Sequence, residues 1–424
     1  MLNLHRARNL ADKLGAGLIT GAADDDPSGL ATYSQAGAQF GAGLLWTTAF
    51  TTPLMISVQM VSARIGWFTG RGLAANIRRI MPRWLTVLLV ALLLFANTLN
   101  IAADIAAMAD ALELMVGGPP HVHSLLFGAL CTVLPLWLGF DAMVRLLKWL
   151  TLALLAYVAV VFMLHVNWGA VLLTTLIPHI QGDGDYWMMV VAVLGTTISP
   201  YLFFWQAAQE AEQRQRFDNR AGAVPADTTT ELFTSEHLQR IRLDTGVGMV
   251  FSNGIAFCVM LATALTLHQH GVTSIQTTRQ AAEALRPIAG NFAFMLFAAG
   301  IIGTGMLAVP VLAASSAYAV ADAFDWRSGL DQRLVEARGF FFVIALGTAI
   351  GTAMDFTPLD PIKALVWSAV VNGVIAVPIM AVMMHLGSRA DVLGTRTLSR
   401  RHRWLGWFAT AVMAAAVVAM VVVG

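Results

Sequence analysis

The chain has 424 residues, of which 57% are hydrophobic and only 12% are charged. Because soluble domains carry about 25% charged residues, this composition argues against a soluble protein and indicates a polytopic protein embedded in a lipid bilayer. The net charge of +1 comes without the basic patch that nucleic-acid binding requires, so we expect no nucleic-acid partner. The two cysteines, Cys131 and Cys258, lie in apolar runs, and we expect them to be core residues.

Apolar stretches along the chain predict eleven membrane-spanning helices, since each span needs roughly 20 mostly apolar residues. They lie at about residues 14–41, 43–63, 84–110, 124–140, 146–166, 187–210, 242–268, 288–321, 338–354, 358–386 and 404–423. The longest polar connection runs from Glu210 to Arg242, where we expect a solvated helix end followed by a surface loop. No connection is long enough for a soluble domain, so residues 1–424 are expected to form one transmembrane domain.

The distribution of Lys and Arg sets the expected orientation, because these residues favour cytoplasmic segments. With a cytoplasmic N-terminus and eleven alternating spans, all 26 Lys and Arg residues except Arg279, Arg286 and Lys363 fall in cytoplasmic segments. A bias this large would be lost if one central span were missed or added. We therefore expect a multi-pass protein of the plasma (inner) membrane, with its N-terminus in the cytoplasm and its C-terminus outside.

The first apolar stretch contains the polar segment ADDDPSG, from Ala23 to Gly29. If this segment were a surface loop, the apolar run before it would have only ten residues, Leu14 to Ala23, about half of what a span needs. It would also invert the charge bias of every later connection. We instead expect one span that is interrupted near its middle, because Pro27 lacks a backbone N–H and disfavours helix at Asp26.

A second interruption falls in the sixth apolar stretch, where a polar, helix-breaking patch runs from Gly195 to Pro200. The two interruptions lie five spans apart, in the first and the sixth span. This spacing is typical of an inverted repeat, with about residues 14–166 in the first unit, 187–386 in the second and 404–423 appended. In such folds the substrate site lies near the membrane midplane, between the two broken helices.

The interruptions place oxygen atoms inside the membrane. Asp26 supplies a carboxylate, whose burial near the bilayer centre costs about 2.5–3.5 kcal/mol unless a cation or proton offsets it. The ends of the half-helices supply free carbonyls, including that of Ala23. Thr196, Thr197 and Ser199 supply hydroxyls, which serve either a ligand or the broken backbone. Sites built from oxygen alone suit hard cations such as Mg²⁺, Ca²⁺ or Mn²⁺.

Other polar residues within the spans are weaker candidates. Asp24 and Asp25 form either an approach to the site or caps of the half-helices. Asn97, Asn100 and Asp104 share one face of the third span by their spacing. They either line a pathway or contact a neighbouring helix.

Three segments, DPSGLATYSQAGAQFG, LGTTISPYLFFWQ and IAADIAAMADAL, together form a family pattern. The first resembles the first-span signature of the natural resistance-associated macrophage protein (NRAMP) family of divalent metal transporters, where Asp-Pro-Gly-Asn precedes a similar Gln-Ala-Gly-Ala run. The second falls where that family has Gly-Ala-Thr-x-Met-Pro-His, and the third is similar to its third span. The resemblance covers essentially the whole chain. It implies a transporter rather than an enzyme, with the all-α fold of the leucine-transporter class, a 5+5 inverted repeat and broken helices 1 and 6.

The resemblance also implies roles for single residues. Asp26 matches the metal-binding aspartate, and Thr196 replaces an alanine that binds metal through its carbonyl. Gly29 stands where the binding asparagine belongs, and Ser199 stands where a methionine thioether belongs. Ser28 is a further departure within the first signature.

Residues tied to proton movement in the family also differ here. Tyr201 and Gln206 occupy the positions of two histidines. Asp104 matches an aspartate of the proton route in the third span, but Ala107 replaces the acid three residues later. These losses argue against strong proton coupling.

Taken together, these departures favour a hard cation. Loss of the sulfur ligand removes discrimination for soft metals, and glycine and serine would leave a larger pocket for a partly hydrated Mg²⁺. We therefore expect a secondary transporter or facilitator resembling the NRAMP-related magnesium transporters. It would move divalent metal cations, Mg²⁺ preferred and Mn²⁺ as well, into the cytoplasm by alternating access, without a cofactor and with weak or no proton coupling. The alternatives are a proton-coupled Mn²⁺/Fe²⁺ transporter, or a transporter of an organic cation or amino acid on the same fold.

Overall fold

The computed structural model describes residues 21, 23–138, 152–178, 180–221, 229–286, 290–330, 332–357, 360–393 and 398–424. Every regular element within these residues is helical, which confirms the predicted all-α class. The helices are α3 (Pro27–Phe40), α4 (Leu45–Thr69), α5 (Leu73–Ile80), α6 (Arg83–Val116), α7 (Pro120–Leu138), α9 (Leu155–Met163), α10 (Trp168–Leu176), α11 (Gly184–Thr197), α12 (Pro200–Ala221), α13 (Thr229–Thr266), α14 (Thr278–Glu283), α16 (Ala293–Phe324), α17 (Arg338–Met354), α18 (Pro361–Gly387), α19 (Ala390–Leu393) and α20 (Arg400–Val423).

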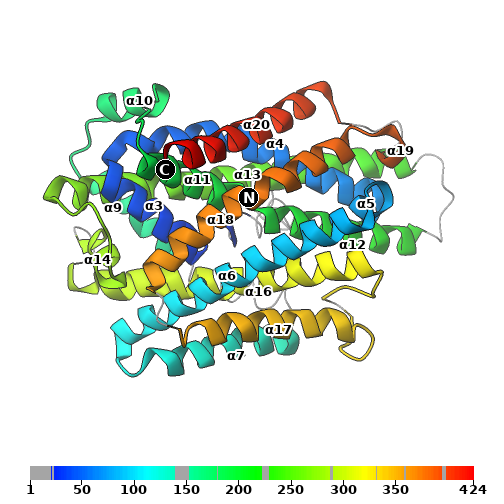
Figure 1. Ribbon diagram of the computed structural model, residues 1–424, viewed down its shortest axis with the longest axis horizontal. Coiled ribbons are helices and arrows are strands. Elements are labelled where there is room, and N and C mark those ends of the chain that lie inside the picture. Colours follow the sequence, from blue (N-terminus) through cyan, green and yellow to red (C-terminus); the bar gives the residue numbers. More distant parts are fainter. Residues whose placement is uncertain are drawn as a thin grey trace, which may run out of the picture.

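Most of the long helices lie along the longest axis of the molecule. Helices α20 and α4 pack together on one side, α6 packs against α16 and α18 across the middle, and α7 and α17 pack together on the opposite side (Figure 1). Helix α3 is short and lies inside this arrangement, where it contacts α11, α13 and α18. The two broken regions of the sequence are therefore surrounded by longer helices.

Seven helical stretches of the described chain are long and apolar enough to cross a membrane, and α3 with α4 counts as one of them. An eighth is added if the 3₁₀ turn η2 (Leu152–Leu154) and α9, which together span Leu152–Met163, form one span with α10, although the two pieces are bent by 118°. Helices α7 and α17 are apolar but shorter. A multi-pass membrane protein is thus supported, while the count of eleven spans stays a prediction.

The expected surface loop from Glu210 to Arg242 is wrong for most of its length. Helix α12 continues to Ala221 and α13 begins at Thr229, and residues 222–228 between them lie outside the described residues. The extension of α12 is polar and carries two i,i+4 ion pairs, Arg214–Asp218 at 2.9 Å and Arg216–Glu212 at 3.6 Å. Such pairs stabilise a solvated helix without apolar burial, and a hydropathy pattern does not detect them.

Glycines allow the helices around the breaks to approach closely. A Cβ added at Gly66 of α4 would lie 2.8 Å from the carbonyl carbon of Ala207 in α12. At Gly373 of α18 it would lie 2.7 Å from the carbonyl oxygen of Val191 in α11. Small residues at helix crossings are typical of membrane proteins, because backbones pack there without a hydrophobic driving force.

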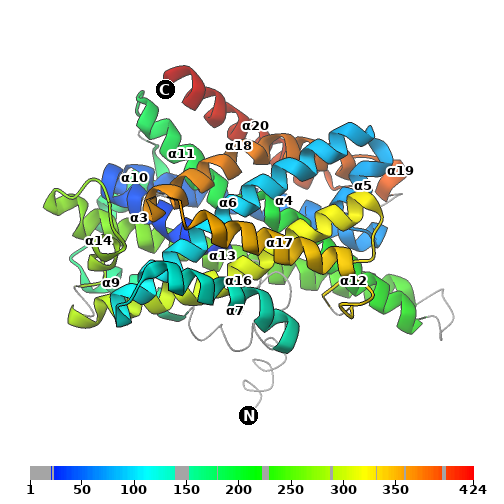
Figure 2. The same cartoon turned by 60° about the horizontal axis from the view of Figure 1, so that its bottom comes forward.

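The segments predicted to be cytoplasmic gather at one end of the molecule. Helix α5, the polar end of α12 and α19 lie at the right end in both views, whereas α10 and α14 lie at the left end (Figures 1 and 2). Arg78 of α5 pairs there with Asp325 at 3.1 Å. Near the opposite end, a Cβ added at Gly184 would lie 2.9 Å from Cα of the C-terminal Gly424. The predicted sides are therefore separated in space, and which of them faces the cytoplasm stays a prediction.

The Gly66 crossing gives a test of this packing. We expect Gly66→Ala to destabilise the protein by about 1–3 kcal/mol, because the added methyl group overlaps the backbone of α12. Gly254→Ala in α13 is the matched control, since nothing lies within 4 Å of the added Cβ. Thermal unfolding in detergent should show a lower melting temperature for Gly66→Ala alone, and equal values for both variants would contradict the close crossing.

Candidate functional site

The first helix break lies at Asp25 and Asp26. Ala23 and Asp24 are helical, Asp25 lies in a bend, and Asp26 is extended with φ −68° and ψ 170°. Helix α3 then begins at Pro27, whose missing N–H costs nothing in a first helical turn. The interruption predicted at this proline is present, and the earlier part of the predicted first span lies outside the described residues.

Asp26 caps the helix that it precedes. Its Oδ1 accepts the backbone N–H of Gly29 at 2.6 Å, and its carbonyl accepts that of Leu30 at 3.0 Å. The residue is only 3% exposed. A carboxylate at this position satisfies a free amide and interacts favourably with the positive end of the helix dipole. Because Asp26 takes this role, Asp24 and Asp25 do not cap α3.

The second break separates α11 from α12. Helix α11 ends at Thr197 and α12 begins at Pro200. Between them, the Ser199 hydroxyl lies 2.7 Å from the carbonyl of Gly195 and 2.9 Å from that of Thr196, and Thr197 likewise donates to the preceding turn at 3.0 Å. Both hydroxyls therefore donate their hydrogens to carbonyls of the last turn of α11, which is the alternative that assigned them to the broken backbone. Their lone pairs remain open to a ligand.

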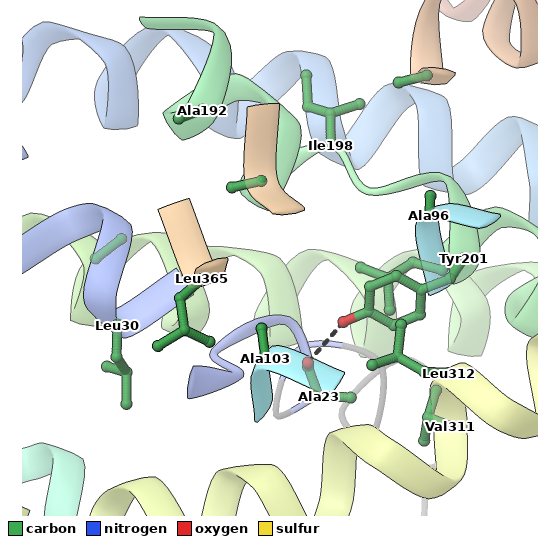
Figure 3. Close-up of a cluster of buried hydrophobic side chains, with 14 of the residues drawn as sticks. Ala23, Leu30, Ala96, Ala103, Ala192, Ile198, Tyr201, Val311, Leu312 and Leu365 are labelled. Atoms are coloured by element: carbon green, nitrogen blue, oxygen red, sulfur yellow. Dashed lines mark hydrogen bonds between the residues drawn. The ribbon is translucent and has the colours of Figure 1, made fainter. Parts of the chain in front are cut away.

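Tyr201 joins the two breaks directly. Its hydroxyl, on α12, donates to the carbonyl of Ala23 at 2.7 Å (Figure 3). Its own carbonyl accepts the hydroxyl of Ser315 in α16 at 2.8 Å. Leu312 lies beside the tyrosine ring in the apolar surroundings shown in Figure 3. The two breaks therefore lie together inside the protein, and the Ala23 carbonyl keeps one lone pair for a ligand.

Gly29 of the first break lies beside Thr196 at the end of α11. A Cβ added there would lie 3.0 Å from Oγ1 of Thr196, 3.2 Å from the carbonyl oxygen of Asp24 and 3.3 Å from Oδ1 of Asp26. All three atoms are oxygens, and all three approach more closely than most Cβ contacts allow. The expected larger pocket is therefore wrong at this position in this conformation, because the Thr196 hydroxyl and the chain itself fill the space of the missing side chain.

Ser28 attaches the first break to α18. Its hydroxyl donates to the carbonyl of Leu365 at 2.9 Å and lies 3.1 Å from the hydroxyl of Ser368. Ser368 also lines a cavity of about 460 Å³ between α6, α17 and α18, bordered by Asp355 and Asp360. Ser28 thus positions the break, and one hydrogen bond separates it from the wall of this cavity.

Asp24 and Asp25 share a partner that the sequence pattern did not single out. The hydroxyl of Ser252 in α13 lies 2.6 Å from Oδ2 of Asp24 and 3.1 Å from Oδ1 of Asp25. Each aspartate is 1% exposed. In the described part of the chain, Oδ1 of Asp24 and Oδ2 of Asp25 have no hydrogen-bond partner. No local signal identifies Ser252, because serine is common within membrane helices.

The polar face of α6 divides into two parts. Asn97 donates to the carbonyl of Leu312 at 3.1 Å and to the hydroxyl of Ser316 at 2.9 Å, so it makes a helix–helix contact. Asn100 and Asp104 are fully buried, and among the described residues none of their side-chain oxygen or nitrogen atoms has a hydrogen-bond partner. These two residues keep the polar capacity that a pathway or a water cluster requires.

The expected solvated helix end at Glu210 is wrong. Glu210 is 3% exposed and accepts a hydrogen bond from Nε2 of Gln206 at 3.1 Å. Nε2 of His237 lies 2.9 Å from its other oxygen, and the ring of Trp67 stacks on His237 with centroids 3.5 Å apart. The early start of α13 at Thr229 explains the difference, because it brings His237 over α12.

The donor atoms at the two breaks are oxygens of mixed origin. They comprise the Asp26 carboxylate, the carbonyls of Ala23 and Thr196 and the hydroxyl of Ser199. Within the ranges that the structure describes, no group of three or more His, Cys, Asp or Glu side chains is arranged to hold a metal. Any ion at the breaks would therefore depend on backbone, hydroxyl and water oxygens beside one carboxylate, a set that suits a hard cation.

The buried contact between Glu210 of α12 and His237 of α13 can be tested by mutation. We expect His237→Ala to destabilise the protein by about 1–3 kcal/mol, because one oxygen of a buried carboxylate loses its partner. Glu210→Gln combined with His237→Ala should recover part of this loss, since no buried charge then remains. Thermal unfolding of the single and double variants measures both effects, and an unchanged melting temperature for His237→Ala would contradict the buried pair.

Comparison with known proteins identifies the family. The model of the natural resistance-associated macrophage protein-like (Nramp) family matches residues 17–423. The divalent metal cation transporter MntH of Deinococcus radiodurans is 27% identical over 414 residues, covering 94% of this chain and 87% of that protein. MntH of Mycobacterium tuberculosis is 26% identical over 410 residues, covering 93% and 87%.

Solved structures agree in fold. The manganese transporter of Eremococcus coleocola, in complex with an aromatic bis-isothiourea substituted compound, superimposes with a TM-score of 0.73 at 16% identity, over 96% of this chain and 86% of that one. MHP1, a nucleobase-cation-symport-1 family transporter, gives a TM-score of 0.61 at 15% identity, over 97% and 90%. At these identities the likeness concerns the fold alone. Since the family model covers nearly the whole sequence, the chain belongs to the Nramp family.

Proposed function

We propose that this protein is a secondary transporter or facilitator that moves divalent metal cations into the cytoplasm by alternating access. In this proposal Mg²⁺ is preferred and Mn²⁺ is also carried. Membership of the Nramp family, and relatives named as divalent metal cation transporters, support metal transport. The single observation that carries the choice of cation is the set of oxygens at the two breaks, where Ser199 stands in place of the thioether of the family pattern.

The transported ion would lie between the breaks. Asp26 would supply the charged ligand, the carbonyls of Ala23 and Thr196 would supply neutral oxygens, and Ser199 would offer its lone pairs. Mg²⁺ dehydrates reluctantly and keeps several waters in most protein sites, so a partial set of protein ligands suits it. The close fit at Gly29 implies that the break regions move apart when a hydrated ion enters.

The membrane arrangement is part of the same proposal. Eleven spans, a 5+5 inverted repeat and an appended last helix would place the two breaks near the midplane of the plasma membrane. The N-terminus would be cytoplasmic and the C-terminus outside. The gathering of α5, the end of α12 and α19 at one end of the molecule supports this orientation, because α5 contains Arg78 and Arg79, the end of α12 contains Arg214, Arg216 and Arg220, and Arg389 directly precedes α19 (Figure 1).

Proton coupling is proposed to be weak or absent. Tyr201 and Gln206 stand where the family pattern has histidines, and neither side chain titrates near neutral pH in its ordinary range. One observation favours the alternative of a proton-coupled Mn²⁺ or Fe²⁺ transporter. Gln206 is hydrogen-bonded to Glu210, which contacts His237, so a carboxyl–imidazole pair lies one contact away from the altered position.

Asp26→Asn tests the proposed ion site. Asparagine caps a helix about as well as aspartate, so this change removes the charge without removing the cap. We expect uptake of Mg²⁺ and Mn²⁺ into proteoliposomes to fall at least about tenfold, because loss of even an indirect metal partner costs 10–100-fold in affinity or activity. Asp185→Asn, at an exposed acid in the first turn of α11, is the matched control. Normal uptake by Asp26→Asn would refute the site.

The two coupling models differ in what they predict for internal pH. With a pH-sensitive dye inside the liposomes, we expect Mg²⁺ uptake without acidification beyond that of protein-free vesicles, because the histidines of the family pattern are replaced. Acidification that accompanies uptake, and that disappears in Glu210→Gln, would instead establish the proton-coupled alternative.

A further inference from the structure

Helix α10 turns away from the direction of the helix before it. The two pieces, Leu152–Met163 and Trp168–Leu176, are bent by 118° at the residues between them. Such a bend is closer to a right angle than to a straight path, so α10 runs across the direction of α9. Since spanning helices tilt by about 20° on average from the bilayer normal, α10 runs roughly along the membrane surface. The bend also falls where the span predicted at residues 146–166 ends.

The two faces of α10 are inverted relative to those of a helix in water. Its outward face carries Leu172, Leu173 and Leu176, which are 58%, 60% and 66% exposed. Val171 and Thr175 are buried instead, and the helix packs on α4 and on the 3₁₀ turn η1 (Gly41–Leu44). A helix in water buries leucine and exposes threonine. The pattern of α10 is therefore that of a helix whose outer face meets lipid.

The polar groups of α10 are satisfied without water. The hydroxyl of Thr174 donates to the carbonyl of Ala170 at 3.0 Å, and that of Thr175 donates to the carbonyl of Val171 at 2.7 Å. At the start of the helix, the side chain of Asn167 accepts the backbone N–H of Ala170 at 3.2 Å. A helix in contact with lipid must satisfy its hydrogen bonds internally, and α10 meets this requirement.

An aromatic pair at the bend is an independent observation. Phe162, near the end of α9, and Trp168, at the start of α10, contact each other with ring centroids 6.3 Å apart, and both side chains are exposed. Residues 152–182 contain no Asp, Glu, Lys or Arg. Tryptophan is enriched where a membrane meets water. The aromatic pair thus joins the exposed apolar surface of α9 to that of α10 without a charged boundary between them.

From these observations we propose that α10 is an interfacial helix, which lies in the membrane surface with Leu172, Leu173 and Leu176 among the lipid acyl chains. Its partner is the lipid bilayer itself, on the side predicted to face outward. The predicted span at residues 146–166 remains, and α10 belongs to the connection that follows it. Because α10 packs on η1, which directly follows α3, it ties the end of that helix to the membrane surface. The proposal does not depend on which cation the protein carries.

Spin labels read by electron paramagnetic resonance test the position of α10. Single labels are placed by Trp168→Cys, Leu173→Cys or Leu176→Cys in the full-length protein in proteoliposomes, with both native cysteines replaced by alanine. Power saturation with oxygen, which enters lipid, and with a nickel chelate, which stays in water, measures the depth of each label. We expect the labels at Leu173 and Leu176 to lie about 5–10 Å into the boundary between headgroups and acyl chains. Gly182→Cys is the aqueous control, since nothing lies within 4 Å of an added Cβ there.

A pair of labels separates an interfacial helix from the second half of a broken span. Trp168 and Leu176 are two turns apart, so about 12 Å of helix axis lies between them. In an interfacial helix their depths should differ by less than about half of this length, whereas a difference of about 12 Å would establish a spanning helix and overturn the proposal.

Two further results would also overturn the proposal. A label at Leu176 that meets the nickel chelate more often than oxygen would place this face in water. A label shielded from both reagents would instead place a second copy of the protein over it. If the Leu176→Cys protein does not fold, Leu172→Cys and Ile177→Cys give the same reading, because both side chains are exposed beside it.

Discussion

The structure around the site depends on one requirement, which is that a helix begins inside the protein with its first amide groups satisfied. Pro27 removes one of these amides and Asp26 accepts another, that of Gly29, at 2.6 Å. Asp26, which caps α3, therefore also holds its own buried carboxylate at the first break.

The second break is satisfied in a different way. The hydroxyls of Thr197 and Ser199 return to the carbonyls of α11, and Tyr201 spans to the carbonyl of Ala23. Side chains thus replace water as partners of the interrupted backbone, as membrane depth requires. In the proposed ion site, a cation would meet only the oxygens that are left over after this exchange.

Much of the fold could be predicted because its signals are local. Apolar length located most of the long apolar helices, and the chemistry of proline located both breaks. The region from Glu210 to Arg242 could not be predicted in the same way, because charged helices resemble loops in a hydropathy pattern. The sequence also could not predict how much space lies beside Gly29. Loss of a side chain enlarges a site only when neighbouring groups do not occupy the space.

The sequence by itself determined that the chain is a membrane protein that resembles the Nramp family and that its first helix breaks at Asp26 and Pro27, and the resemblance predicts oxygen in place of sulfur at Ser199. Only the tertiary structure decided which oxygens are already used. Ser28 is bonded to Leu365, 337 residues away, and Asp24 to Ser252, 228 residues away. A hydroxyl has one hydrogen to donate, and its direction depends on neighbours that the fold brings from distant parts of the chain.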